Sequence, residues 1–586
     1  MKNWIYATAT VALCAPVATL AQEKNCDISE ELTSISTIQG ANDQSDKIGE
    51  QLTTMGIVTQ NLAAPEQLGG VYIQSPESLQ DDDPKTSEGL FVSANSTTFA
   101  DLKVGTLVKL SGQVSEQDGL TQLTDVTELY ECGQQPQVAP VTVTLPFSSR
   151  QQAEAHEGML VTVNGQKPLT ISGHYPLARY GYFDVSSGRL FTPTQVALPG
   201  SEAAAVAEAN ELNRLQIDDN SQLEPKSLPH QQLFHGPQQS LRSGATLKPL
   251  SGVLSQFRDD YRLQPTKPPQ LAQRSRITAI LPKRKNEVRV ASFNVLNYFN
   301  GDGMGGGFPT ERGAKTPQQL QRQQAKVVAA IDALDADIVG LMEVENDGFE
   351  QHSAIRQLTD AVNAVSDINY AIAQPHSARV GTDQISVGIL YNAERFKTST
   401  HALTLTQGPF RRGSRVPLAQ VFTDKITEQT FTTVVNHFKS KGSCPDDGVN
   451  ANQQDGQSCW NALRVESAAT LLDWIEQQQM PKPILLGDFN AYYYEDPMRY
   501  FTENDYQNVS EADDYSYVYD SQAGALDHIL IHQDLTSMLT RVQHLNFNAD
   551  EPISYDYRDD QYYRPGPYRA SDHDPLLVDL VFASPD

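Results

Sequence analysis

The sequence predicts an α/β fold: a mixed-sheet sandwich in the C-terminal half of the chain, preceded by a β-rich N-terminal region. From residue 286 onward, apolar strand-like runs alternate with segments of helical period. Before residue 286, short apolar clusters are separated by Gly, Asp and Asn turns, which is typical of small barrels or sandwiches. At 586 residues the chain is long enough for about two to four domains.

The first segment, 1–21, reads as a secretory signal peptide that is cleaved after Ala21. Lys2 supplies the positive start, and the run from Ile5 to Leu20 is small and apolar. Cys14 follows a leucine rather than a small residue, which favours a cleaved signal over a lipid anchor. No later run approaches the roughly 20 apolar residues that span a bilayer. We therefore expect a secreted monomer, extracellular or periplasmic, with no membrane anchor.

A β domain in the form of a small barrel or sandwich is expected over 22–135. The clusters "TTMGIVTQN", "GGVYIQS" and "GLFVSAN" are followed by the longer "TLVKLSGQVSEQDGLTQLTDV", with turn residues between them. These clusters lack the interleaved Lys, Arg and aromatic residues that line a groove for single-stranded nucleic acid. A spacer role and a DNA-binding role for this domain both stay open.

A second β-rich domain with a connector is expected over 136–285. Its strand-like pieces are "PVTVTLP", "GMLVTVNG" and "GYFDVSS", and it ends in the Pro-containing "QPTKPPQLAQRSR".

The C-terminal segment, 286–586, supplies the α/β sandwich. Helical periods are expected over 317–334, 354–365 and 461–479. The strand-like runs are 288–299, 337–346, 384–392, 430–440, 481–492, 524–532 and 574–582.

The strands of this segment end in small polar clusters of one chemical kind. Loops that leave one edge of a sheet gather such groups into a single cleft. Carboxylates and amides are ligands for Mg²⁺, Mn²⁺ or Ca²⁺, and two imidazoles beside them can move protons. Each cluster alone could be a turn or a hydrogen-bonded strand residue. Their recurrence in one order indicates a site made of Asn294, Glu343, His437, Asp488 with Asn490, Asp527, and Asp572 with His573.

The cysteines predict two disulfides. Four remain after the signal segment, and an even number in an exported chain favours pairing. Proximity in sequence pairs Cys444 with Cys459, and Cys26 with Cys132 would join the two ends of the N-terminal unit. A zinc site is less expected because the four come in distant pairs.

The net charge of −28 argues against a broad electrostatic grip on nucleic acid. A polyanionic substrate would need metal ions to offset this repulsion, although an acidic surface also suits a salty medium. Candidate phosphate contacts inside the acidic C-terminal segment are Lys439, Lys441, Arg312, Arg322 and Arg464. The tyrosine-rich "YYYEDP" and "YDYRDDQYYRPGPYR" could stack on bases or cover a surface.

Several motifs together resemble the endonuclease/exonuclease/phosphatase superfamily, the group of deoxyribonuclease I and the abasic-site endonucleases. They are "SFNVLNYF", "DADIVGLMEVEND", "NHFKSKG", "CWNALRVESA", "LLGDFNAYYYEDP", "LDHILIH" and "SDHDPLLVDL". The chain after the signal segment, including "ISTIQG" and "GGVYIQS" at its front, is most similar to the large secreted nucleases of Gram-negative bacteria. This resemblance implies that the β domain at 22–135 is OB-fold-like. The resemblance implies a DNase I-like four-layer α/β sandwich over 286–586.

The resemblance also implies roles for individual residues. Asn294, Glu343 and Asp572 would hold a divalent ion, Mg²⁺ or Mn²⁺, with Ca²⁺ as a further candidate. Asp488 and Asn490 would orient the nucleophile or the transition state. His437 would stabilise or protonate the scissile phosphate, and His573, held in its tautomer by Asp527, would transfer protons. Apart from the resemblance, we expect Lys439, Arg312 and Arg464 among the candidate phosphate contacts to bind substrate.

The leading hypothesis is therefore a metal-dependent nuclease that hydrolyses extracellular DNA, or RNA as well, with endonucleolytic action. A second hypothesis keeps the machinery but changes the substrate to nucleotides or lipids, as a phosphatase or phosphodiesterase. A third is a nucleic-acid-binding surface protein without activity, against which the presence of every matched site position argues. Asp574 is expected only to fix the turn into its strand.

Overall fold

The computed structural model describes residues 26, 32–93, 99–398 and 400–582, so the predicted signal segment lies outside the described residues. The chain divides into two compact units. Unit 1 comprises Met1–Asn164, Leu215–Glu224 and Pro249–Lys267, and unit 2 comprises Gly165–Arg214, Pro225–Lys248 and Pro268–Asp586. The domain boundaries expected from the sequence stay a prediction.

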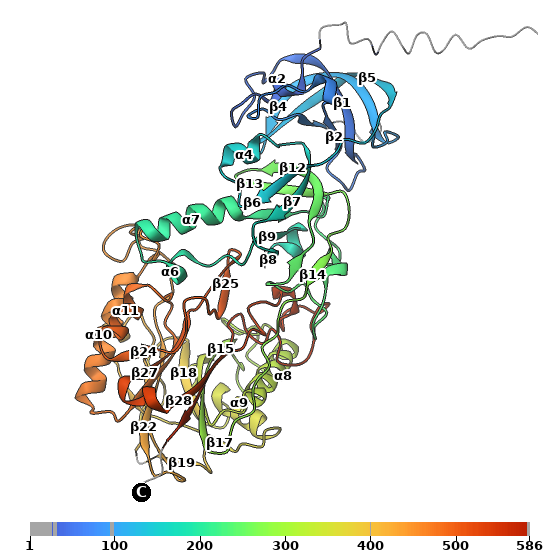
Figure 1. The fold of residues 1–586 in the computed structure, drawn as a ribbon. Coiled ribbons are helices and arrows are strands. Elements are labelled where there is room, and N and C mark those ends of the chain that lie inside the picture. The colour runs from blue at the N-terminus through green and yellow to red at the C-terminus, as the bar shows by residue number, and fades with distance from the viewer. Residues whose placement is uncertain (1–25, 27–31, 94–98, 399, 583–586) are drawn as a thin grey trace, which may run out of the picture. The chain divides into compact units, whose positions relative to one another are not determined.

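Unit 1 contains a closed five-stranded barrel, drawn in blue in Figure 1. Its strand order is β1-β2-β3-β5-β4, in which β1 also pairs with β4 and β3 runs parallel to β5. This confirms the β-rich character of the N-terminal region. Five strands are also the number in an OB-fold, and the OB-fold assignment itself stays a prediction. The elements are α2 (Ile35–Gln39), β1 (Gln51–Leu62), β2 (Gly70–Gln74), η1 (Glu77–Leu79), β3 (Gly89–Ser93), β4 (Thr106–Gln117) and β5 (Leu120–Gln134).

The barrel is filled by alternating apolar side chains, as the period of a strand requires. Val58, Ile73 and Leu110 are among those that solvent hardly reaches. The rest of unit 1 is a sheet in the order β10-β13-β12-β7-β6, with one short helix. Its elements are β6 (Val141–Leu145), α4 (Arg150–Glu154), β7 (Leu160–Gly165), β10 (Leu215–Ile217), β12 (Leu250–Phe257) and β13 (Asp260–Pro265).

Unit 2 contains the predicted α/β sandwich, in which two mixed sheets pack face to face. The first has the order β17-β18-β16-β15-β29-β28, and only β15 and β16 are parallel. These strands are β15 (Glu287–Tyr298), β16 (Ile338–Glu345), β17 (Tyr370–Ile372), β18 (Ile385–Asn392), β28 (Leu539–His544) and β29 (Leu576–Val581).

The second sheet has the order β19-β21-β22-β23-β27-β24, with β20 also paired to β21. Within it, β22 and β23 are parallel. The strands are β19 (Phe396–Thr398), β20 (Leu403–Thr404), β21 (Leu418–Asp424), β22 (Thr430–His437), β23 (Pro483–Asp488), β24 (Tyr506–Asn508) and β27 (Asp527–His532).

Helices cover the outer face of each sheet, which gives four layers (Figure 1). The helices α8 (Pro317–Leu334) and α9 (Ala354–Asn363) pack on the first sheet, and α10 (Asn461–Gln477) and α11 (Asp496–Thr502) pack on the second. The expected four-layer sandwich is thus confirmed. The helix predicted over 461–479 ends two residues early because Gln479 has a φ of 50°, which no α-helix accommodates.

The earlier part of unit 2 contributes short elements. These are β8 (Leu169–Gly173), α5 (Leu177–Tyr180), β9 (Phe183–Ser187), α6 (Pro193–Val196), α7 (Ser201–Asn213), η2 (Gln231–Leu233), β11 (Thr246–Leu247) and β14 (Leu271–Gln273). Later come η3 (Gly408–Phe410), the hairpin β25 (Tyr517–Tyr519) and β26 (Gln522–Gly524), η4 (Gln533–Met538) and η5 (Ile553–Tyr555). Among the described residues, none of the helices has the length and apolarity that crossing a membrane requires.

Candidate active site

Three predicted site residues are neighbours on the second sheet because of its strand register. His437 ends β22 and lies beside Asp488, which ends the parallel strand β23. Asp488 in turn lies opposite Asp527, the first residue of the antiparallel strand β27. The last residues of parallel strands and the first residue of an antiparallel one share an edge of the sheet, so this register gathers three polar groups at one place.

The first sheet brings Asn294 and Glu343 to the same edge through an irregular stretch. The pairing of β15 with β16 shifts register after Asn294. Glu343 has a φ of 65°, a conformation that costs free energy for a residue with a Cβ. Its Oε2 accepts a hydrogen bond from the backbone N–H of Asn297 at 2.9 Å. Bulges of this kind often lie beside active sites, where they redirect a side chain.

A hydrogen bond joins the two sheets at this edge. The amide Nδ2 of Asn294 donates to Oδ2 of Asp488 at 3.3 Å, and Oδ1 of Asp488 accepts the backbone N–H of Asn490 at 2.9 Å. The side chain of Asn490 donates to the carbonyl of Phe438 at 3.1 Å. Asp488 is therefore held in one orientation. Burial raises its pKa to about 7.

His573 and Asp527 form a buried pair. Nδ1 of His573 lies 2.6 Å from Oδ2 of Asp527, and the hydroxyl of Ser516 donates to the same oxygen at 2.7 Å. The ring of Tyr517 packs on the imidazole with centroids 4.7 Å apart. Asp527 outweighs the effect of burial and holds the pKa of His573 well above its usual range. The pairing fixes the proton on Nδ1 and leaves Nε2 to exchange a proton with a bound water or substrate.

His437 has the opposite electrostatic environment. Burial, and after it the positive charge of Arg415, holds the pKa of His437 well below its usual range. Nη1 of Arg415 donates to Nε2 of His437 at 3.3 Å, and Oδ2 of Asp488 lies 3.6 Å from the same nitrogen. A neutral imidazole is therefore expected here until an anion arrives. The two histidines of the site thus have distinct protonation states, which is typical of an acid/base pair.

Glu343 and Asp572 are carboxylates without a basic partner. Neither forms an ion pair within the part of the chain that the structure describes. Burial and the nearby charge of Asp572 raise the pKa of Glu343. Two like charges that share a partly buried site need a cation to be stable together. These oxygen donors fit a hard divalent ion such as Mg²⁺ or Mn²⁺.

A second set of possible ligand atoms overlaps the histidine pair. One atom each of Asp488, Asp527 and His573 lies within 4.8 Å of the others. The 2.6 Å hydrogen bond between His573 and Asp527 already engages two of those atoms. A cation there would have to displace the shared proton, so the unpaired carboxylates Glu343 and Asp572 are the better metal site.

These groups line a cavity of about 590 Å³. Its walls contain Glu343, His437, Asp488, Asn490, Asp572 and His573, together with Arg312 and Arg415. Both arginines approach Asp383, at 3.9 Å for Arg312 and 3.3 Å for Arg415. The cavity therefore combines unpaired acids with two guanidinium groups, which suits an anionic ligand that arrives with a metal.

The three predicted substrate contacts have different surroundings. Arg312 lines the cavity. Lys439 lies over the ring of Trp460 at 4.9 Å and donates to the carbonyls of Ser440 and Gly442, so it is engaged by its own loop. Arg464 has an exposure of 0 %, and its guanidinium donates to three backbone carbonyls. Its surroundings are those of a structural residue and do not support a contact with substrate.

Arg415 is a site residue that no sequence pattern identifies. It follows "RRGS" in a polar loop before β21, and nothing in that loop singles out one arginine. The signal that identifies it is three-dimensional: its side chain reaches both His437 and the carbonyl of Phe438.

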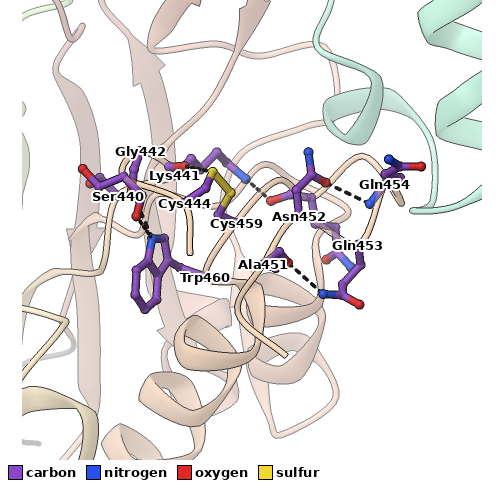
Figure 2. The surroundings of a disulfide bond; sticks show 12 residues. Ser440, Lys441, Gly442, Cys444, Ala451, Asn452, Gln453, Gln454, Cys459 and Trp460 are labelled. Atoms are coloured by element: carbon purple, nitrogen blue, oxygen red, sulfur yellow. Dashed lines mark hydrogen bonds between the residues drawn. A yellow bond between two sulfur atoms is a disulfide. The ribbon is translucent and has the colours of Figure 1, made fainter. Parts of the chain in front are cut away.

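The loop between Ser440 and Trp460 forms another part of the cavity wall and is closed by the disulfide Cys444–Cys459 (Figure 2). The indole of Trp460 donates to the carbonyl of Gly442 at 3.0 Å. Both predicted disulfides, this one and Cys26–Cys132, are present.

Lys441 lies at the start of the same loop and is partly buried. Its Nζ lies 2.6 Å from both carboxylate oxygens of Glu495, and burial lowers its pKa to about 8. The predicted phosphate contact Lys441 is thus already paired with a carboxylate, although it lines the cavity.

Asp574 supports the site from behind. Its Oδ1 accepts the backbone N–H groups of Asn548 and Ala549, and its own N–H donates to the carbonyl of Ser516 at 2.7 Å. These bonds connect the turn before β29 to the segment that carries Ser516, the partner of Asp527.

Residues 291–573 match the Endonuclease/Exonuclease/phosphatase family. This part of the chain belongs to the endonuclease/exonuclease/phosphatase superfamily, as the sequence motifs indicated. Members of the family are hydrolases of phosphoester bonds, commonly dependent on divalent metal, and the site geometry agrees with that reaction class. The narrower resemblance to large secreted nucleases stays a prediction. No curated protein sequence matches the chain.

Solved structures of similar fold include the human Nocturnin catalytic domain with bound sulfate, with 17% identity and a TM-score of 0.33, covering 51% of this chain and 94% of that one. Mannosyl-6-phosphatase of Bacteroides thetaiotaomicron has 17% identity and a TM-score of 0.33, with 50% and 100% covered. TDP2 of D. rerio, complexed with a single-strand DNA product, has 13% identity and a TM-score of 0.32, with 50% and 99% covered. Likenesses at this level add no argument about the substrate.

Proposed function

We propose that this chain is a secreted, divalent-metal-dependent nuclease that hydrolyses phosphodiester bonds of DNA, and of RNA as well, by endonucleolytic attack. The observation that carries the proposal is the His573–Asp527 pair at 2.6 Å beside the unpaired carboxylates Glu343 and Asp572. Phosphodiester hydrolysis needs a group that moves protons and positive charge that offsets the phosphate.

The metal site would be formed by Glu343, Asp572 and the amide oxygen of Asn294. A divalent ion bound there supplies positive charge to the phosphate oxygens and lowers the pKa of nearby groups. The side chains of the site would orient the attacking water and transfer its proton. Asp488 and Asn490 would orient the attacking water.

Without a cation the pKa of His573 is held high by the acids around it, and a divalent ion bound beside it would lower that pKa. The neutral imidazole would then accept a proton from the water at Nε2 while Asp527 stabilises the imidazolium that forms. The oxygen of the water then bonds to phosphorus, the bond to the leaving oxygen breaks, and the leaving oxygen takes a proton from solvent. The guanidinium of Arg415, with His437 beside it, would stabilise charge on the nonbridging oxygens. Arrival of the phosphate would raise the pKa of His437, so that it can donate a hydrogen bond.

Export is supported by the signal-like segment 1–21 and by the two disulfides, since disulfides persist in oxidising compartments. Recovery of the activity from culture medium or periplasm, rather than from cytoplasm, would test it.

The test of activity is the nicking of supercoiled plasmid by the purified exported protein with Mg²⁺ or Mn²⁺, and its loss in EDTA. The variant His573→Ala should lower the rate by about 10²- to 10⁴-fold, the usual contribution of a proton-transfer residue. His532→Ala is the matched control, because His532 is at the other end of the same strand, β27.

Wild-type rates in His573→Ala would show that the site is misassigned. Hydrolysis of phosphomonoesters without cleavage of any polynucleotide would replace the proposal by a phosphatase. No cleavage of any phosphoester would leave only a binding role.

A further inference from the structure

The hairpin β25–β26 places an exposed aromatic side chain at the wall of the catalytic cavity. Tyr517 and Tyr519, both on β25, line the cavity together with His573. Tyr517 packs on the imidazole, whereas Tyr519 is 68% exposed. Adjacent to the reacting groups, therefore, one tyrosine ring is engaged and the other is open to solvent.

The exposure of Tyr519 does not come from a loose loop. The backbone of Ala523 on β26 accepts a hydrogen bond from Thr192 and donates one to Leu190, each at 2.9 Å. At the turn of the hairpin, Asp520 pairs with Arg214 at 2.8 Å. These contacts anchor the hairpin, so the ring is held at the cavity before any ligand binds.

A second aromatic ring, that of Tyr492, lies next to the hairpin and also lines the cavity. A Cβ added to Gly524 would come within 2.5 Å of the Tyr492 ring, which shows how closely β26 packs on it. The cavity thus has a buried aromatic floor and an exposed aromatic wall.

Other exposed tyrosines of unit 2 lack this setting. Tyr175 and Tyr180 are 73% and 53% exposed, and neither lines the catalytic cavity. Tyr519 is distinguished by its position rather than by its exposure alone.

The chemistry of the substrate suggests what such a surface receives. Bases flank every phosphodiester of a nucleic acid, and stacking on an aromatic ring is tolerant of sequence because every base has a π-face. A chain with a net charge of −28 cannot rely on general attraction to phosphate, so uncharged contacts carry more of the binding. Gln522, also at the cavity wall, offers hydrogen-bonding groups for a base edge.

We propose that Tyr519, on a hairpin packed against the buried ring of Tyr492, forms a subsite that stacks the nucleobase next to the scissile phosphate. This inference rests on the proposed nuclease function and assigns to it a binding residue for the base. A substrate that lacks an aromatic group at this position, such as a sugar phosphate, would gain nothing from the subsite.

The experiment uses oligonucleotides in which one phosphodiester is left cleavable between phosphorothioate linkages. One version carries normal nucleotides on both sides of that bond, and two others carry an abasic analogue on the 5′ or on the 3′ side. The proteins are the wild type, Tyr519→Ala, Tyr519→Phe and the control Tyr175→Ala, with folding checked by circular dichroism.

For the normal substrate, Tyr519→Ala should lower kcat/KM by roughly tenfold, the size of one base–aromatic stack, while Tyr519→Phe and Tyr175→Ala stay near wild type. On one of the two abasic substrates, the kcat/KM of the wild type should be lower than on the normal substrate by a similar factor. On that abasic substrate, the kcat/KM of Tyr519→Ala should equal that of the wild type. Equal rates of wild type and Tyr519→Ala on the normal substrate would overturn the subsite while leaving the nuclease intact. Cleavage of none of the oligonucleotides by the wild type would instead refute the proposed function.

Discussion

The two ends of the central strands in unit 2 bury acidic side chains in contrasting ways. At the active-site end, Glu343 near the end of β16 and Asp572 before β29 have no basic partner among the described residues. At the other end of the same strands, Asp337 precedes β16 and Asp579 lies near the end of β29. There each carboxylate has a guanidinium.

The paired end is a dense network. Nε and Nη2 of Arg289 donate to the two oxygens of Asp579 at 2.7 and 3.0 Å. Arg395 bridges Asp337 and Asp424 at 3.1 and 3.2 Å. A bidentate pair with little exposure satisfies its charges within the protein.

The difference between the two ends indicates that the carboxylates at the active-site end are arranged to bind a cation. The same sheet buries carboxylates with their partners where nothing has to bind. At the cavity, in the part of the chain that the structure describes, Glu343 and Asp572 have no such partners, and the raised pKa of Glu343 indicates charge that is costly to bury. A bound divalent cation would neutralise the negative charge of these carboxylates.

The largest effect is expected from the isosteric change Glu343→Gln at the unpaired end. Loss of a metal ligand should lower nuclease activity by at least roughly 100-fold, because the ion supplies several kcal/mol of transition-state stabilisation. Thermal stability without metal should be unchanged or higher, since a neutral amide removes a buried, repelled charge. Plasmid nicking and thermal unfolding in EDTA measure both; a clear loss of stability in EDTA would contradict the comparison.

At the paired end the change Asp579→Asn should act on folding instead. It leaves Arg289 buried without its carboxylate, which should cost about 3–5 kcal/mol of unfolding free energy. The folded fraction should keep wild-type activity per molecule. Denaturant unfolding checks the first outcome and active-site titration the second; a cost below about 1 kcal/mol would show that this network does not hold the sandwich together.

Unit 1 offers a third kind of buried carboxylate, one that is held by a neutral group. Oε2 of Glu154 accepts the hydroxyl of Tyr261 at 2.8 Å, and burial raises its pKa to about 7. The folded state keeps this proton up to about pH 7, whereas the unfolded chain releases it near pH 4.5. Stability from the proton is thus present below pH 4.5 and is lost as pH rises to 7.

The expected loss over this range is about 3 kcal/mol. In the variant Glu154→Gln the unfolding free energy should fall less over this pH range, and the remaining fall should come from the neighbouring acid Glu157. Urea unfolding between pH 4.5 and 7.5, with hydrogen exchange of unit 1 peptides, follows the change. If the unfolding free energy of Glu154→Gln fell with pH as steeply as that of the wild type, Glu154 would not be a source of this pH dependence.

Much of the site could be expected from sequence because its residues lie at the ends of recognisable strands. Asp488 follows "PILLG" and His437 follows "TFTTVVN", and in a layered sheet such positions meet at an edge. The alternation of strands and helices predicted a mixed-sheet α/β sandwich, and the resemblance to a known family supplied its four layers.

Other contributions depend on contacts that no local pattern contains. Arg464 and Arg415 are equally basic in sequence, but one is enclosed by backbone carbonyls and the other faces the cavity. Thr192 belongs to a stretch nearly 100 residues before the catalytic segment, yet it lines the same cavity. The chemistry at Tyr519 likewise depends on where the hairpin is anchored.

The central claim is that the unpaired carboxylates bind a divalent cation, and thermal unfolding across a Mg²⁺ or Mn²⁺ series tests it most directly. The proteins are the wild type, Glu343→Gln and Asp579→Asn. At a cation concentration 100 times Kd, binding to the folded state should add about 2.7 kcal/mol. We predict this gain in the wild type and in Asp579→Asn but not in Glu343→Gln. An equal gain in Glu343→Gln, or none in the wild type, would contradict the account.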